Sequence, residues 1–181
     1  TRDEHLQIID HSHISLKVDV EEPLRVGIDR LLNALAARQH CPDGEPVVII
    51  DVGSAVTVDL LDEQNVFRGG AIFPGPRLMA RALHDYTAAL PDLAIDEVPG
   101  IDPPGRNTND AMTAGIMAAI LGACQLLVDE YALLCSRPPV VLMAGGAVGY
   151  LIDYDFAPNI GVGGPFPLTL EGIRIAAEAL K

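Results

Sequence analysis

The sequence predicts an α/β fold in a single domain, in which a three-stranded antiparallel meander precedes alternating helices and strands. Two observations lead to this prediction. Three apolar runs of strand length follow one another between residues 47 and 73, with turn-forming residues between them, which is typical of strands joined by short hairpins. Further along the chain, apolar residues recur at helical spacing on both sides of another strand-length run, which favours helices packed on a sheet.

The segment before the meander is expected to hold extended pieces and one helix. Apolar and polar residues alternate loosely over residues 8–20, which indicates one or two extended segments. Over residues 24–38, apolar residues lie three and four positions apart, as on one face of a helix. The polar residues 40–46 then form a turn.

The meander strands are predicted at residues 47–51, 56–61 and 66–73. The first of them is a continuous apolar run that ends in an aspartate, which is the pattern of a buried strand. Turns at residues 51–54 and 62–65 separate the strands, so neighbouring strands are expected to pair antiparallel.

Two helices are predicted after the meander, with an irregular Pro- and Gly-rich connection at residues 91–106 between them. The first helix covers residues 77–86. The second is long, starts near Thr108 and has N-cap candidates at residues 107–110. Its expected apolar stripe includes small residues and consists of Met112, Ile116, Ala119, Ala123 and Leu126.

The last part of the chain is predicted to contain a buried strand at residues 138–144, a glycine turn that opens a short helix, and a final helix at residues 168–180. Taken with the meander, this order of elements is analogous to one half of an actin-like, ribonuclease-H-like kinase fold.

The composition excludes some classes of partner. The formal net charge is −13, which argues against nucleic acid or an anionic membrane surface, because both require a basic footprint. Residues 111–128 carry no charge and approach the length of a membrane span. However, acidic residues flank this run and no basic or aromatic anchors mark its ends, so a buried helix is expected instead.

The cysteines indicate a reducing compartment. Cys41, Cys124 and Cys135 are widely spaced and form no C-x-x-C pair. A sparse, odd set of this kind argues against a disulfide framework or a zinc site. It favours reduced thiols in a cytoplasmic protein.

Two short motifs can carry chemistry. Asp51 ends a strand and is followed by Gly53 and Ser54, an arrangement suited to a cation and to nucleotide phosphates; an ordinary hairpin turn is the alternative. Asp29 and Arg30 are adjacent near the start of a predicted helix and can supply a base and a carboxylate-binding fork. The alternative for this pair is a solvated pair on a helix face.

Three further features indicate a function less strongly. Paired glycines in residues 69–75 suggest a close ligand or a bulge. Residues 105–108 form a helix N-terminus that suits an anion, or they simply cap the helix. His11 and His13 are expected on one face of a strand, but the sequence offers no third fixed ligand, so a metal site there is not favoured.

Seven motifs, in order over almost the whole chain, resemble the type III pantothenate kinase family. They lie at residues 23–30, 50–59, 69–75, 87–91, 105–108, 144–146 and 168–172. Each motif is weak singly, and their specificity comes from the shared order. The family phosphorylates the primary hydroxyl of pantothenate with a nucleoside triphosphate, the first step toward coenzyme A.

The resemblance implies a role in catalysis or binding for several of the motif residues. Asp29 is expected to be the general base or to aim the hydroxyl, since orientation dominates in phosphoryl transfer. Asp51 is expected to bind a monovalent cation, K+ or NH4+, and the nucleotide is expected to be ATP with Mg2+. The residues implied to bind pantothenate are Gly27, Ile28, Asp29, Arg30 and Thr108, and those implied to bind the nucleotide are Gly53 and Ser54.

The chain departs from the family pattern in two places. Ser54 replaces the usual threonine but keeps the hydroxyl. Family members also open with an Asp-x-Gly-Asn-Thr phosphate loop about a hundred residues before the motif at Gly27, and this chain begins much closer to that motif. Residues 1–181 are therefore expected to be the C-terminal lobe of the kinase, and the isolated chain is expected to be inactive.

The resemblance also implies a homodimer with the active site at its interface, for which the Ala-rich helix from Thr108 is the candidate packing surface. Two alternatives remain open. One is a non-catalytic regulatory or binding module. Some members of the family have been described as accessory transcription factors, but the acidic composition disfavours that role here. The other is a sugar or acetate kinase of the same superfamily.

Overall fold

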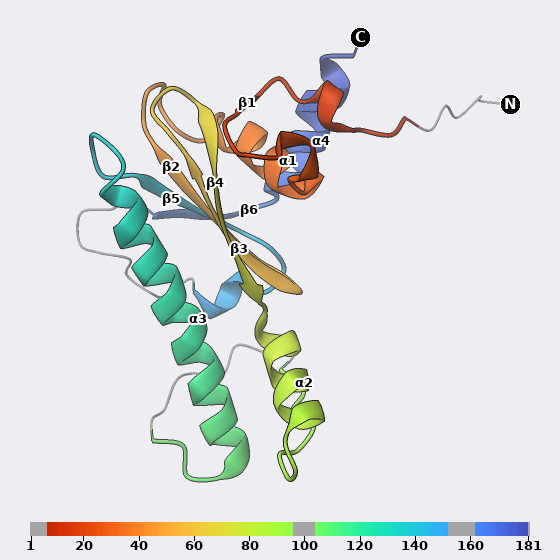
Figure 1. Ribbon diagram of the computed structural model, residues 1–181, viewed down its shortest axis with the longest axis vertical. Coiled ribbons are helices and arrows are strands. Elements are labelled where there is room, and N and C mark those ends of the chain that lie inside the picture. Colours follow the sequence, from red (N-terminus) through yellow and green to blue (C-terminus); the bar gives the residue numbers. More distant parts are fainter. Residues whose placement is uncertain (1–6, 96–103, 152–161, 181) are drawn as a thin grey trace, which may run out of the picture.

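The computed structural model describes residues 7–95, 104–151 and 162–180. Within them, one six-stranded sheet has the strand order β1-β4-β3-β2-β5-β6, with helices on both of its faces (Figure 1). The strands are β1 (Lys17–Val18), β2 (Val47–Val52), β3 (Ala55–Leu61), β4 (Val66–Pro74), β5 (Val140–Ala144) and β6 (Val162–Phe166).

The pairing of the strands is mixed. β3 runs antiparallel to both β2 and β4, so the three strands of residues 47–74 form a meander at the centre of the sheet. β5 is parallel to β2, and β6 is parallel to β5. These parallel neighbours come from the later part of the chain, where helices alternate with strands as in other α/β proteins.

Alternation along β2 divides the core into two layers, because successive side chains of a strand point to opposite faces. Val48 and Ile50 pack with α3 (Thr108–Ala132). Val47 and Ile49 pack with α1 (Ile28–Ala37) and α4 (Leu168–Glu178) on the other face. The helix α2 (Pro76–Tyr86) lies beside α3 and extends beyond the end of β4 (Figure 1).

The pair of helices α1 and α4 packs very closely at Gly172. A Cβ at this position would lie 2.2 Å from the backbone oxygen of Leu32. Any side chain there would force the helices apart, so the glycine sets the distance at which α4 crosses α1.

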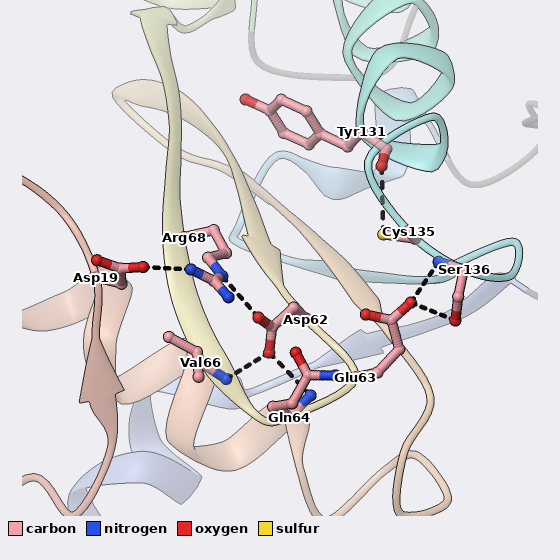
Figure 2. A network of polar contacts seen from close by, with 9 residues as sticks. All are labelled: Asp19, Asp62, Glu63, Gln64, Val66, Arg68, Tyr131, Cys135 and Ser136. Carbon is pink, nitrogen blue, oxygen red and sulfur yellow. Dashed lines mark hydrogen bonds and ion pairs between the residues drawn. The ribbon is translucent and has the colours of Figure 1, made fainter.

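A polar network fixes the β3–β4 turn (Figure 2). Asp62 is buried and accepts the backbone N–H groups of Gln64 and Val66 at 2.9 Å each, and it also pairs with Arg68. Glu63 accepts the backbone N–H and the hydroxyl of Ser136. The turn is thereby tied to the segment that follows α3.

The N-terminal part differs from the sequence prediction in two ways. The helix expected from residue 24 is a 3₁₀ turn, η2 (Pro23–Arg25), followed by α1, because Gly27 has extended rather than helical ψ (132°). His11 and His13 lie in another 3₁₀ turn, η1 (His11–His13), and not on a strand. His11 contacts the backbone oxygen of Val26, whereas His13 contacts Asp10.

The predicted stripe on α3 was partly wrong. Ala119 and Leu126 are exposed, and Leu126 is 59% exposed. The buried positions advance in four-residue steps, which shift gradually around a helix of 3.6 residues per turn, so the face against the sheet winds around α3 and departs from the straight stripe that we assumed. Its buried residues are Met112, Ile116, Met117, Ile120, Leu121, Cys124 and Val128.

The same helix is the one described helix with the length and composition of a membrane span, with a mean hydropathy of 1.9. Its buried side packs on Val48, Ile50 and Val52 of the sheet. Core helices share this composition, so the sequence interpretation of a buried helix agrees with the packing. The short helix expected after the glycine turn is η3 (Val148–Tyr150).

Candidate active site

Carboxylates collect on the face of the sheet that α1 and α4 cover. Asp51 lies opposite Thr57 in the β2–β3 register, and Ile49 lies opposite Asp59. Because Ile49 belongs to the core under α1 and α4, the two-residue period places Asp51, Thr57 and Asp59 on this same face. The face is thus apolar near the start of β2 and polar toward its end.

Arg30, which is half-buried, and Asp59, which is buried, form an ion pair between α1 and β3. The Arg30 Nε lies 3.1 Å from each carboxylate oxygen of Asp59, and Nη2 also donates to Oδ1. The Asp59 side chain is 1% exposed and that of Arg30 is 13% exposed. Burial raises the pKa of Asp59 above its ordinary value, and the Arg30 guanidinium opposes this shift. One edge of the Arg30 guanidinium, formed by Nε and Nη2, is therefore already bound to a protein carboxylate.

Gly70 in β4 leaves space for this ion pair. A Cβ at Gly70 would lie 2.1 Å from the backbone oxygen of Val58 and 2.4 Å from Oδ1 of Asp59. A side chain at this position would therefore displace the Asp59 carboxylate. Close approach of a neighbouring backbone and carboxylate explains Gly70.

Asp51 is held by a second polar chain. The Asn33 side-chain amide donates to Oδ2 of Asp51 at 2.7 Å, and Asn33 accepts the Thr169 hydroxyl at 2.7 Å. Burial raises the pKa of Asp51, the Asn33 hydrogen bond opposes this, and the nearby Asp29 charge adds to the rise. A Cβ at Gly145 would lie 2.4 Å from Oδ1 of Asp51, so the glycine turn after β5 lies directly against this oxygen.

Asp51 borders a cavity of about 510 Å³. The cavity lies where the parallel strands β2 and β5 end and where α4 begins, the usual place for a ligand in an open α/β sheet. It is lined by Asp51, Ala144, Gly145, Gly146, and residues 165–170. Gly53 and Ser54 are exposed in the turn just after Asp51, and the Ser54 backbone oxygen accepts the N–H of Gly75 at 3.0 Å.

Asp29 lies in the first turn of α1 and is exposed. Its Oδ1 accepts the backbone N–H of Arg30 at 3.0 Å, and a Cβ at Gly27 would lie 2.6 Å from the same oxygen. Gly27 therefore lets the carboxylate fold back over the helix start. Ile28 is half-buried and packs on the core under α1. An exposed carboxylate beside Asp51 and the Arg30–Asp59 pair can accept a proton from a bound hydroxyl.

Thr108 lies elsewhere in the molecule. It is the first residue of α3 and lines an apolar groove of about 740 Å³ between α2 and α3. The N-terminal end of α3 lies at the opposite end of the molecule from α1 (Figure 1). Within one chain, the structure therefore brings together Asp29, Arg30 and Asp51, but it does not bring Thr108 to them.

Three residues of this site had no role in the sequence analysis. Asp59 was visible as a carboxylate within an otherwise apolar strand, and Asn33 as an amide among buried leucines and alanines of a helix. Either pattern signals a buried polar contact, because such groups are rarely left without a partner. Thr169, in a helix first turn, gave no comparable signal.

The fold belongs to the class of actin-like ATPase folds. The chain matches a solved structure titled a putative Baf family transcriptional activator from Campylobacter jejuni, with a TM-score of 0.59 and 20% identity over 92% of this chain and 69% of that chain. It also matches Ta0583, an archaeal actin homologue, with a TM-score of 0.50 and 16% identity over 86% of this chain and 54% of that one. At these identities the likeness shows the fold alone.

The chain belongs to the type III pantothenate kinase family, whose family model matches residues 3–130. It is 39% identical to the type III pantothenate kinase of Rhodopirellula baltica, over 82% of this chain and 53% of that protein. It is 35% identical to the protein of the same name from Listeria monocytogenes, over 88% of this chain and 59% of that protein. The chain thus spans little more than half the length of these relatives.

Proposed function

We propose that the chain forms the pantothenate- and cation-binding part of a kinase that transfers the γ-phosphoryl group of ATP to the primary hydroxyl of pantothenate. The observation that carries this proposal is the meeting of Asp29, Asp51 and the Arg30–Asp59 pair on one face of the sheet. Membership of the type III pantothenate kinase family supports pantothenate as the substrate. A cytoplasmic location, as for an enzyme of coenzyme A synthesis, is part of the proposal.

Asp29 acts on the attacking hydroxyl. As the new O–P bond forms and the bond to the ADP oxygen breaks, the hydroxyl proton passes to the Asp29 carboxylate. Because the transition state of phosphoryl transfer is loose, aiming the hydroxyl contributes more than removing its proton. Gly27, Ile28 and Arg30 line the acceptor side, and the remaining N–H donors of Arg30 face the substrate.

The charge of the site supports a role for cations. Three carboxylates, those of Asp29, Asp51 and Asp59, stand against one guanidinium, that of Arg30. A triphosphate approaching this excess of negative charge requires cations to offset it. Asp51 can hold a monovalent ion, K+ or NH4+, because its Oδ1 faces the Gly145 turn beside the cavity.

Mg2+ would arrive with the nucleotide. Among the described residues, no group of three or more His, Cys, Asp and Glu side chains can hold a metal ion. Magnesium commonly binds through substrate phosphates with few protein ligands, so this arrangement fits ATP with Mg2+. In this proposal Gly53 and Ser54 contact the phosphates, which their exposure in the turn beside Asp51 permits.

Thr108 reaches the acceptor site from a second copy of the chain in a homodimer. Support comes from its distance from α1 within one chain (Figure 1) and from the apolar groove that it lines. Co-expression of Asp29→Asn with Thr108→Val tests this arrangement. In a mixed dimer one site keeps both residues, so kinase activity should return although each variant alone has little. Lack of recovery in purified mixed dimers would reject the shared site.

The central test is Asp29→Asn in the full-length protein, with ADP release measured at saturating pantothenate. We expect a loss of at least about a hundredfold in kcat, within the range for a positioned acid or base. Asp129→Asn, an exposed aspartate near the end of α3, is the matched control. Full activity of the Asp29 variant would contradict the assignment.

The isolated 181 residues are proposed to turn over negligibly, and robust activity from them would contradict that part of the proposal.

A further inference from the structure

Asn33 joins the last described helix to the aspartate proposed to hold the monovalent cation. It is 1% exposed and lies in the middle of α1. One end of its amide accepts the hydroxyl of Thr169, from the first turn of α4, and the other end donates to Asp51, each at 2.7 Å. Three elements, α4, α1 and β2, thus meet in one chain of two hydrogen bonds.

The two hydrogen bonds fix the orientation of the amide. An ionised carboxylate only accepts, so the Asn33 NH2 must face Asp51. The Asn33 oxygen then faces Thr169, whose hydroxyl can donate to it. A reversed amide would place its oxygen against the Asp51 carboxylate and leave a buried acceptor unpaired, which is costly.

The fixed amide determines which oxygen of Asp51 is presented. Oδ2 is occupied by Asn33, and Oδ1 lies against the Gly145 turn at the cavity edge. Without the Asn33 bond, the carboxylate could rotate about its last torsion, which is soft in aspartate. We propose that Asn33, aligned by Thr169, is a positioning residue that holds Oδ1 of Asp51 toward a monovalent cation. This inference rests on the proposed role of Asp51 as the cation ligand.

The chain offers a control for a merely structural role. Glu171 also joins α4 to the segment after α1, through His40 at 2.5 Å, but it lies outside the hydrogen-bond chain of Asp51, Asn33 and Thr169. If Thr169 only holds the helices together, then Glu171→Gln and Thr169→Val should have similar effects. If Thr169 acts through Asn33, only the second variant should change the response to the cation.

The test is a K+ titration of the full-length protein, with choline chloride keeping the ionic strength constant. Thr169→Val should raise the K+ concentration for half-activation about tenfold, the lower end of the range seen when a residue behind a metal ligand is removed. kcat at saturating K+ should change less than twofold. Thr169→Ser, which keeps the hydroxyl, should restore the parent value, and Glu171→Gln should match the parent.

A second readout does not depend on turnover. K+ should raise the thermal unfolding temperature of the parent without nucleotide, because an ion that binds only the folded state stabilises it. The same K+ concentration should raise it less in Thr169→Val than in Thr169→Ser. Equal K+ responses of Thr169→Val and the parent in both assays would overturn the inference, as would equal losses in Thr169→Val and Glu171→Gln.

The experiment separates this inference from the proposed function. Asp51→Asn is included and should abolish the K+ response. If Asp51→Asn responds to K+ like the parent, the cation assignment of Asp51 fails, and the positioning role falls with it. If Asp51→Asn loses the response while Thr169→Val keeps it, the cation site stands and only the role of Asn33 and Thr169 is rejected.

Discussion

Replacing Asp59 by asparagine should destabilise the protein strongly, because it removes the countercharge of a buried guanidinium. The side chains of Arg30 and Asp59 are 13% and 1% exposed. Removing one partner of a buried pair costs about 3–5 kcal/mol. Asparagine keeps one acceptor for Arg30, and it removes the burial penalty on the Asp59 charge that raises the pKa of this carboxyl. We therefore expect the lower end, about 3 kcal/mol, or roughly a hundredfold in the unfolding equilibrium constant.

Urea denaturation of the chain at neutral pH, followed by circular dichroism, measures this cost. With a denaturant slope of about 2 kcal/mol per molar, the midpoint should fall by about 1.5 M. Asp19→Asn is the matched control, since Asp19 pairs with Arg68 through side chains that are 60% and 42% exposed. Exposed pairs contribute about 1 kcal/mol or less. If Asp59→Asn costs no more than Asp19→Asn, the buried pair does not stabilise the fold as argued.

Two other predictions concern stability. Burial raises the pKa of Asp51 above 3.8, and the neighbour that opposes this shift is the neutral amide of Asn33, whereas Asp59 faces the charged Arg30. The ionised form of Asp51 therefore opposes folding, and the parent should lose stability as pH rises through the raised pKa. Asp51→Asn should therefore be more stable than the parent at pH 7, with a difference that shrinks toward pH 4; a difference that grows on acidification would contradict the sign. Gly172→Ala should cost about 2 kcal/mol or more in urea denaturation, because its Cβ would overlap Leu32. Gly122→Ala, also within a helix but with open space around it, should instead stabilise by about 0.5–1 kcal/mol, and equal effects of the two would argue against close helix packing.

Most elements of the fold were predictable because their signals are local. The β2, β3 and β4 strands lie within a residue or two of the predicted runs, and α2 and α3 begin within a residue of their expected starts. The Asn107 side chain caps α3 by accepting the N–H of Asp110, as the N-cap rule predicts. The start of α1 was predicted less well, because Gly27 interrupts an apolar periodicity that continues across it.

The sequence by itself determined the family, through the order of seven motifs, and it determined which residue types stand at each strand end and helix start. Only the tertiary structure shows which side chains these residues contact. It showed that Asp59 occupies the fork of Arg30, that Asn33 connects Thr169 to Asp51, and that Thr108 lies away from Asp29 within one chain. Periodicity and turn chemistry act over a few residues, whereas these contacts join residues up to 136 positions apart and depend on strand register and helix crossing.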